Sequence, residues 1–172
     1  MNAQPEKTIT ELMQYNNWAN QQVLAACQKV SQSELAAPIP GAYGSIRDTL
    51  EHIIQGEVFY LKLLTGNPPQ PSFQWEAKPG LAEMKDYAAQ VGNALVDAIN
   101  TVRPTDQIHE VDEQGTKFSY QALALFIQII NHGVEHRTNI TTILNQGQTP
   151  PPAVDGWAYL SAHPDRFDYE VT

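Results

Sequence analysis

The spacing of apolar residues along the chain predicts four long helices. In each of four segments, apolar side chains return every three or four positions, which places them on one face of an α-helix. These segments cover residues 6–29, 45–64, 81–102 and 120–146. Helices of this length, joined by long connections, indicate an all-α protein with the architecture of a four-helix bundle.

Proline, glycine and short β-type patterns mark the connections between these helices. Residues 66–80 contain several prolines and are expected to form an irregular loop. Residues 108–111 and 116–120 flank the sequence D-E-Q-G, which predicts a short hairpin or an extended excursion of the chain. The last helix should end near Gly147, and residues 147–172 are expected to form an irregular tail. The full length, residues 1–172, is appropriate for one domain.

Charge and composition exclude several classes of partner. The chain carries ten basic and nineteen acidic residues, a formal net charge of -9, and no basic stretch. Neither nucleic acid nor an anionic membrane surface is therefore an expected partner. The apolar run ALALFIQII is far shorter than the ~20 residues needed to span a bilayer. With Cys27 as the single cysteine, no internal disulfide can form, and we expect a cytoplasmic protein.

The sequence N-H-G-V-E-H places two histidines, His132 and His136, on the apolar stripe of the fourth predicted helix. A buried imidazole left without a partner costs about 1–3 kcal/mol. A spacing of four residues brings both rings to one helix face, where they can reach the same ion. The structural alternative is that each ring hydrogen-bonds a buried carboxylate or carbonyl group.

A third histidine, His52, lies at the edge of the apolar face of the second predicted helix. Three histidines from two helices match the ligand sets of catalytic metal sites, which leave a coordination position open. The sequence therefore predicts a divalent metal site formed by His52, His132 and His136. Nickel and zinc both accept three imidazoles, and the rings must be neutral to bind either ion.

Other polar and aromatic residues are candidates for supporting this site. Glu57 lies on an apolar stripe and is a candidate general base, with an exposed position at the edge of the stripe as the alternative. Gly56 and Gly133 each neighbour a histidine or lie one turn from one, and they are expected to make room beside the metal. Trp18 is expected to pack in the core or to line a pocket. Residues expected to support the ligands are Asn16, Asp48, Gln55, Gln128 and Asn139. The alternatives are that Asp48 caps its helix and that Gln128 and Asn139 face solvent.

Three sequence blocks resemble the DinB/YfiT-like family: Y-N-N-W-A-N at 15–20, L-E-H-I-I-Q-G-E-V-F-Y-L at 50–61 and N-H-G-V-E-H-R at 131–137. The resemblance implies a four-helix bundle, often a homodimer, that holds a divalent metal through three histidines, here His52, His132 and His136. Thr138 and Asn139 stand where many relatives have Gly-Gln. This departure concerns the outer part of the site, and so the substrate.

Three hypotheses for function follow. The family includes transferases that use low-molecular-weight bacterial thiols and a mycothiol-dependent maleylpyruvate isomerase. The resemblance thus implies a metal-dependent enzyme that transfers such a thiol to a small electrophilic substrate, or isomerises that substrate. The second hypothesis is a hydrolase that uses metal-bound water, with Glu57 as the base. The third is a noncatalytic stress-response dimer whose metal stabilises the fold.

Overall fold

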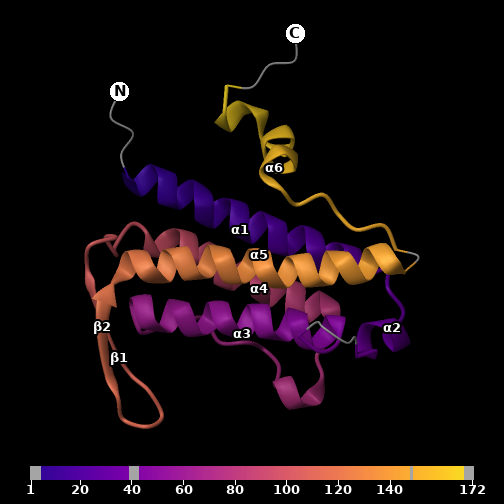
Figure 1. Ribbon diagram of the computed structural model, residues 1–172, viewed down its shortest axis with the longest axis horizontal. Coiled ribbons are helices and arrows are strands. Elements are labelled where there is room, and N and C mark those ends of the chain that lie inside the picture. The colour runs from indigo at the N-terminus through magenta and orange to yellow at the C-terminus, as the bar shows by residue number, and fades with distance from the viewer. Residues whose placement is uncertain (1–4, 39–42, 148, 169–172) are drawn as a thin grey trace.

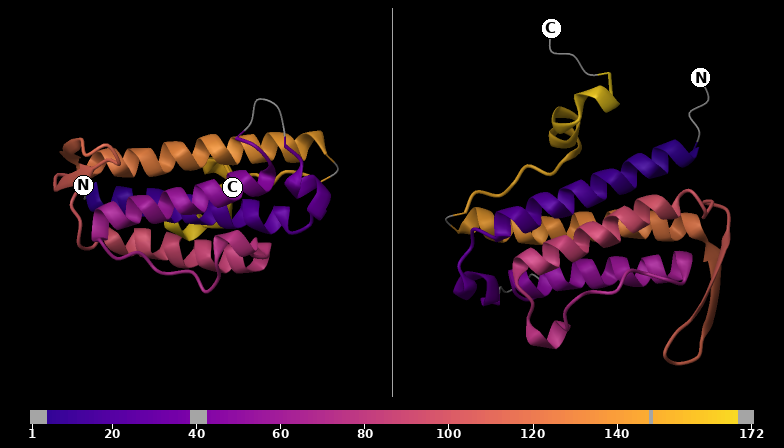
Figure 2. Two further views of the ribbon diagram at one scale, coloured as in Figure 1. Left: turned by 90° about the horizontal axis from the view of Figure 1, so that it is seen from below. Right: turned by 180° about the vertical axis from the view of Figure 1, so that it is seen from behind.

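Four long helices form the body of the molecule. The computed structural model describes residues 5–38, 43–147 and 149–168. The long helices are α1 (Pro5–Cys27), α3 (Ile46–Thr65), α4 (Leu81–Ala98) and α5 (Ala122–Gln146), and they lie side by side as an elongated bundle (Figures 1 and 2). The prediction of a helical bundle is therefore confirmed. The third long helix ends at Ala98, earlier than the predicted residue 102.

The order of the helices around the bundle determines which side chains can meet. α1 packs against α4 and α5, and α3 packs against the same two helices. Their apolar faces form a continuous core, in which Met13, Leu61, Met84 and Ile129 are each at most 2% exposed. Burying a side chain of this size contributes about 1.5–3 kcal/mol relative to leaving it exposed. Because α3 and α5 are neighbours, the predicted histidines from these helices face a shared interface.

The start of α3 is determined by a capping box. The backbone N–H of Asp48 donates to the Ser45 hydroxyl at 3.1 Å, and the backbone N–H of Ser45 donates to the Asp48 carboxylate at 2.9 Å. These bonds satisfy donors that the first helical turn leaves free. The backbone N–H and the hydroxyl of Ser45 both donate to the Asp48 carboxylate, and these two bonds lower the pKa of Asp48. Asp48 is therefore a capping residue, and the cap sets the position of His52 in the second turn of α3.

The connections contain more structure than the apolar pattern predicts. The hairpin is confirmed as β1 (Gln107–Val111) paired antiparallel with β2 (Lys117–Gln121), with Ile108 opposite Tyr120. Two short helices were not expected, α2 (Gln32–Ala36) and η1 (Trp75–Ala77). Each is too short to show a helical period, because a single turn holds only ~3.6 residues.

The C-terminal segment is partly helical, and the expectation of an irregular tail was wrong. It contains α6 (Gly156–Ala162) and η2 (Pro164–Arg166), which lie beyond α1 on the side away from α3 (Figures 1 and 2). Tyr159 is 4% exposed, and its hydroxyl donates to Glu11 of α1 at 2.7 Å. The Tyr15 hydroxyl donates to the Val154 carbonyl at 2.9 Å. Polar contacts thus join the tail to α1.

None of the described helices is long and apolar enough to cross a bilayer. This agrees with the short apolar runs of the sequence.

Candidate metal centre

The three predicted histidines meet between α3 and α5. One ring nitrogen from each of His52, His132 and His136 lies within 4.8 Å of the other two. The Nε2 atoms of His52 and His132 are 2.9 Å apart. His132 and His136 are 8% and 7% exposed, and His52 is half-buried. The cluster is therefore largely enclosed, with its α3 member closest to solvent.

Burial keeps the three imidazoles neutral. Desolvation, together with the neighbouring His136 and His52, lowers the pKa of His132 to about 4, because burial disfavours the charged ring and adjacent imidazolium ions repel one another. Desolvation also lowers the pKa of His52 and of His136. Only the neutral form has a free nitrogen lone pair for a metal. The cluster is therefore in the protonation state that metal binding requires at neutral pH.

The hydrogen bonding of the cluster differs from that of ordinary buried histidines. Within the described residues, the Nδ1 atoms of His132 and His136 are buried and have no hydrogen-bond partner. The ring partner of His132 is another histidine, not a carboxylate or carbonyl group. Three neutral imidazoles with nitrogens this close form a donor set that suits a divalent transition metal. The structural alternative, in which each ring pairs with a carboxylate or carbonyl group, is not what these contacts show.

Two tyrosines that sequence reasoning missed border the cluster. The ring of Tyr43 stacks on His52 with centroids 3.9 Å apart, and it meets the ring of His136 edge-on at 5.2 Å. Tyr60 meets His132 edge-on at 5.6 Å. Tyr60 follows His52 by eight residues, about two helical turns, so helical spacing could have revealed it. Tyr43 lies outside any helix and carries no such signal.

Gly56 provides the space that the His132 ring occupies. A Cβ atom at Gly56 would lie 2.8 Å from His132 Cε1, which is closer than two non-bonded carbon atoms approach in proteins. The expectation that this glycine makes room beside the site agrees with the structure. Gly133 has a different neighbourhood, because a Cβ there would meet Asn16 and Arg137.

A buried polar network lies beside the cluster and contains Glu57. This side chain is 1% exposed, and its Oε1 accepts hydrogen bonds from Asn16 at 2.6 Å and Asn20 at 2.7 Å. The Oδ1 atoms of both asparagines accept from Arg137 Nη1 at 2.7 Å. Burial raises the pKa of Glu57, and the asparagines and Arg137 oppose this rise. Glu57 is therefore an interior residue and not an exposed residue at the edge of the apolar stripe; its role as a general base stays a prediction.

This network has a direct structural consequence for the metal site. Arg137 follows His136 in α5, while the two asparagines belong to α1 and Glu57 to α3. The network thus joins three helices at the level of the histidines. Arg137 is 2% exposed, and sequence reasoning gave it no role of its own.

The remaining predicted residues lie at different distances from the cluster. Gln128 donates to the Tyr60 hydroxyl at 3.2 Å and so reaches the site through that ring. Trp18 packs against Tyr159 and His163, at the contact between α1 and the tail. Within the described part of the chain, neither Trp18 nor Asn139 has a hydrogen bond or ring contact with the three histidines.

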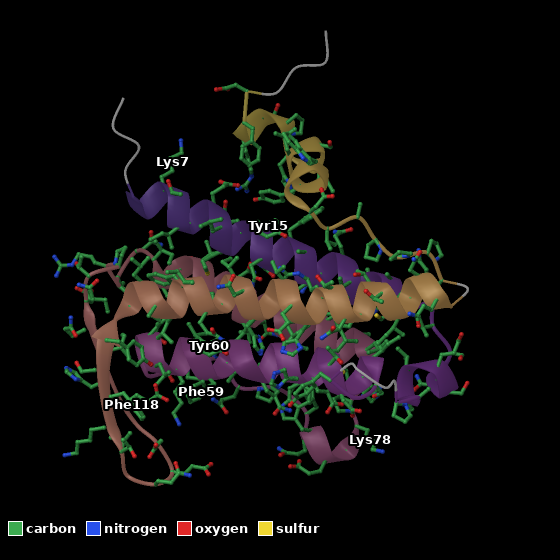
Figure 3. The ribbon with its side chains drawn as sticks, viewed as in Figure 1. Lys7, Tyr15, Phe59, Tyr60, Lys78 and Phe118 are labelled. Atoms are coloured by element: carbon green, nitrogen blue, oxygen red, sulfur yellow. The ribbon has the colours of Figure 1, made fainter. Side chains whose placement is uncertain are left out.

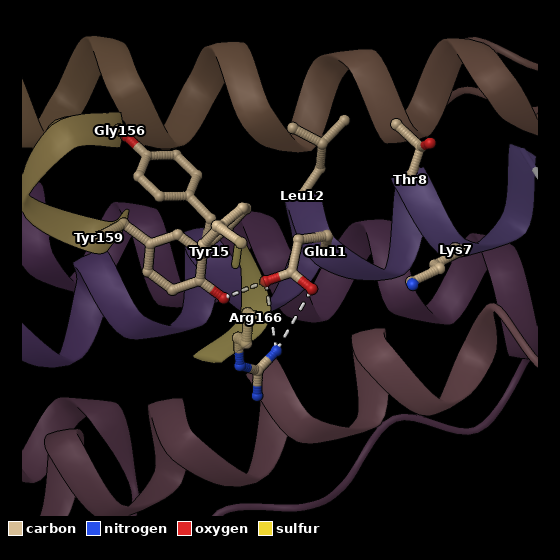
Figure 4. A pocket seen from close by; sticks show the side chains of 9 residues that line it. Lys7, Thr8, Glu11, Leu12, Tyr15, Gly156, Tyr159 and Arg166 are labelled. Carbon is tan, nitrogen blue, oxygen red and sulfur yellow. Dashed lines mark hydrogen bonds and ion pairs between the residues drawn. The ribbon is translucent and has the colours of Figure 1, made fainter. Parts of the chain in front are cut away.

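A cavity of about 680 Å³ lies elsewhere, between α1 and the C-terminal segment (Figure 4). Tyr159 and Arg166 project toward Glu11 at its edge, and both bond to that carboxylate. None of the three histidines lines this cavity. The chemistry-bearing cluster and this cavity are therefore separate features.

Together the helical bundle and the cluster define a class of protein: a bundle whose facing helices present three histidines that could hold a metal ion. The sequence pattern of the DinB family matches residues 1–167, and the chain belongs to that family. It is 23% identical over 159 residues to Protein DinB of Bacillus subtilis (strain 168), a match that covers 87% of this chain and 92% of that relative.

Proposed function

We propose that His52, His132 and His136 hold a divalent metal ion, nickel or zinc. The observation that carries this proposal is the convergence of three ring nitrogens within 4.8 Å of one another. The lowered pKa values of the rings support it, because they leave the nitrogens unprotonated at neutral pH. The unpartnered Nδ1 atoms of His132 and His136 support it too, because nothing in the described residues accounts for burying them.

We further propose that the site is that of an enzyme that transfers a low-molecular-weight thiol to a small electrophilic substrate, or isomerises it. A bound ion with an open position would lower the pKa of a thiol and hold it as the reactive thiolate. The chain's own residues would provide the enclosure. Tyr43 and Tyr60 shield the histidines on two sides, and the network of Arg137 and Glu57 keeps the helices in register.

The hydrolase alternative has less support from the structure. A general base must approach the water that it activates. Glu57 is 1% exposed, and its Oε1 already accepts two hydrogen bonds. A noncatalytic role for the metal predicts different results. Removal of the ion would lower the thermal stability, and no thiol would bind at the site.

The first experiment measures metal content. Protein purified without a histidine tag is subjected to elemental analysis beside His52→Ala and His132→Ala. His109→Ala is the matched control, because His109 is an exposed residue of β1 outside the cluster. We expect stoichiometric metal in the wild type and control, and loss in both cluster variants. Metal retained in His132→Ala would refute the site.

The second experiment separates the proposed activities. Cobalt-loaded protein is titrated with a small thiol while its visible absorption is recorded. A spectral change supports thiol binding at the metal, whereas hydrolysis of an ester without added thiol would favour the hydrolase. An unchanged spectrum together with a large loss of stability on metal removal would favour the noncatalytic role.

We also propose that the chain forms a homodimer through an apolar stripe on α1 and α5. Leu12, Leu123, Ile127 and Val134 are 42–54% exposed, and the three α5 residues recur at helical spacing. Val134 is two residues from each α5 histidine, about 200° around the helix, so this stripe faces away from the metal site. We expect Ile127→Lys to give monomers in sedimentation velocity. Val111→Lys, which alters an exposed apolar residue of β1, should leave the dimer intact.

A further inference from the structure

A groove lies beside the histidine cluster, between α3, α5 and the hairpin. Its volume is about 310 Å³. Phe59 and Tyr60 of α3 line one side, and Figure 3 shows both on the part of α3 that lies toward the hairpin. Leu125 and Gln128 of α5 line another side, and Glu110 and Tyr120 of the hairpin line the far end. The proposed metal-dependent reaction assigns no role to this groove.

The groove adjoins the metal site through the side chain of Tyr60. Tyr60 lines the groove and also meets the His132 ring edge-on at 5.6 Å. Gln128, which donates to Tyr60, lies one helical turn before His132. Leu125 lies seven residues before His132, which corresponds to ~10 Å along the helix axis. A molecule that extends from the groove past Tyr60 could thus place one end at the histidines and the other at the hairpin.

The hairpin places a carboxylate at the far end of the groove. Ile108 and Glu110 share one face of β1 because side chains two residues apart point the same way. Ile108 is 7% exposed in the core, so Glu110 also faces the bundle. The Tyr120 hydroxyl donates to Glu110 Oε2 at 2.6 Å, which holds the carboxylate in place. Within the described residues, Glu110 Oε1 accepts no hydrogen bond and is free for a ligand.

The residues that line the groove favour a ligand with a positive charge. Among the described residues, the walls are aromatic and aliphatic apart from Gln128, and Glu110 is the one charged residue that lines the groove. No lysine or arginine belongs to this described lining. A cationic group at the far end would pair with the carboxylate, whereas a second carboxylate would be repelled.

We propose that this groove binds the substrate of the metal site, and that this substrate is an amine with an apolar body of ~10 Å whose ammonium group pairs with Glu110. This inference rests on the proposed function, because the metal site determines which group lies at the other end of the substrate. The groove and its charge selection can be tested separately from the metal.

The test uses three thiols of matched length: 8-aminooctane-1-thiol, octane-1-thiol and 8-mercaptooctanoic acid. Each is titrated into cobalt-loaded protein, and dissociation constants are taken from the cobalt absorption. We expect the aminothiol to bind about fivefold more tightly than octane-1-thiol, which is typical of one partly exposed ion pair. The mercapto acid should bind most weakly.

Matched variants identify the residue responsible. Glu110→Gln should abolish the preference for the amine while leaving the affinity for octane-1-thiol unchanged. Glu113→Gln removes the same charge from the exposed turn of the hairpin and should keep the preference. Ala124→Phe, at an exposed α5 position that lines the groove, should weaken all three long thiols but not 2-mercaptoethanol.

The outcomes separate this inference from the proposed function. Thiols that all change the cobalt spectrum, but with equal affinities for amine and acid, would overturn the groove while retaining the metal site. If no thiol changes the spectrum, octylamine and octanoate are titrated into metal-free protein, followed by the amide resonances of Ala124 and Gln128. A preference for octylamine that Glu110→Gln removes supports the groove, and equal binding or no binding of the two overturns it.

Discussion

Replacing Gly56 by alanine should weaken metal binding without weakening the fold. The new Cβ would lie 2.8 Å from His132 Cε1. Two carbon atoms normally approach to about 3.5 Å, so the ring must move by about 0.7 Å. Metal–nitrogen bonds tolerate deviations of only about 0.2 Å. In the metal-free protein the ring can move aside, but in the loaded protein it cannot move this far and remain a ligand.

The two effects of this substitution have opposite signs. Alanine is favoured over glycine inside a helix by about 1 kcal/mol, so the metal-free variant should be as stable as the wild type or slightly more stable. A displaced or strained ligand should lower the metal affinity by about 10- to 100-fold, as changes beside metal ligands do. At 1.4 kcal/mol for each factor of ten, this is about 1.4–2.8 kcal/mol.

The assay combines competition and unfolding. Zinc affinity is measured by competition with a chromophoric chelator, and stability by urea denaturation of metal-free protein. Gly156→Ala is the matched control, because a Cβ at this position meets nothing within 4 Å. An unchanged zinc affinity in Gly56→Ala would refute the argument that His132 is a ligand in the position observed. A large loss of metal-free stability would refute the argument that the ring can move aside.

Three further predictions concern the buried groups. Arg137→Leu should lower the free energy of unfolding, measured by urea denaturation, by about 3 kcal/mol, because it leaves the Glu57 carboxylate without a countercharge. Adding Glu57→Gln to this variant should recover part of the loss, because the carboxylate is then replaced by a neutral amide. The lowered pKa values of the three histidines predict a contribution to the stability of the metal-free protein that is fully present above pH 6.5 and is lost as the pH falls toward about 4, the value for His132. Zinc affinity should decline over the same range, and a metal-free stability that rises on acidification would contradict the assignment. Burial raises the pKa of Cys27 to about 12, so a thiol reagent should react with it only after denaturation, and rapid reaction of the native protein would contradict its burial.

The local features of this protein follow from its sequence. The placement of His132 and His136 on one face depends only on helical geometry, which repeats every ~3.6 residues wherever a helix forms. The cap at Ser45 and the hairpin of residues 107–121 also depend on neighbours in the chain. The family resemblance rests on such local blocks, and the match of the DinB family to residues 1–167 confirms it.

The tertiary structure decided the features that depend on residues far apart in the chain. His52 and His132 are 80 residues apart, and their 2.9 Å contact depends on how α3 is rotated against α5. The same holds for Glu57, because its burial depends on asparagines from α1 and an arginine from α5. The apolar period of a helix shows which face turns inward, but it does not specify which polar residues of other helices that face meets. The packing of α1 and α5 against α3 therefore decides that Glu57, an acidic residue on an apolar stripe, lies at the centre of a buried polar network.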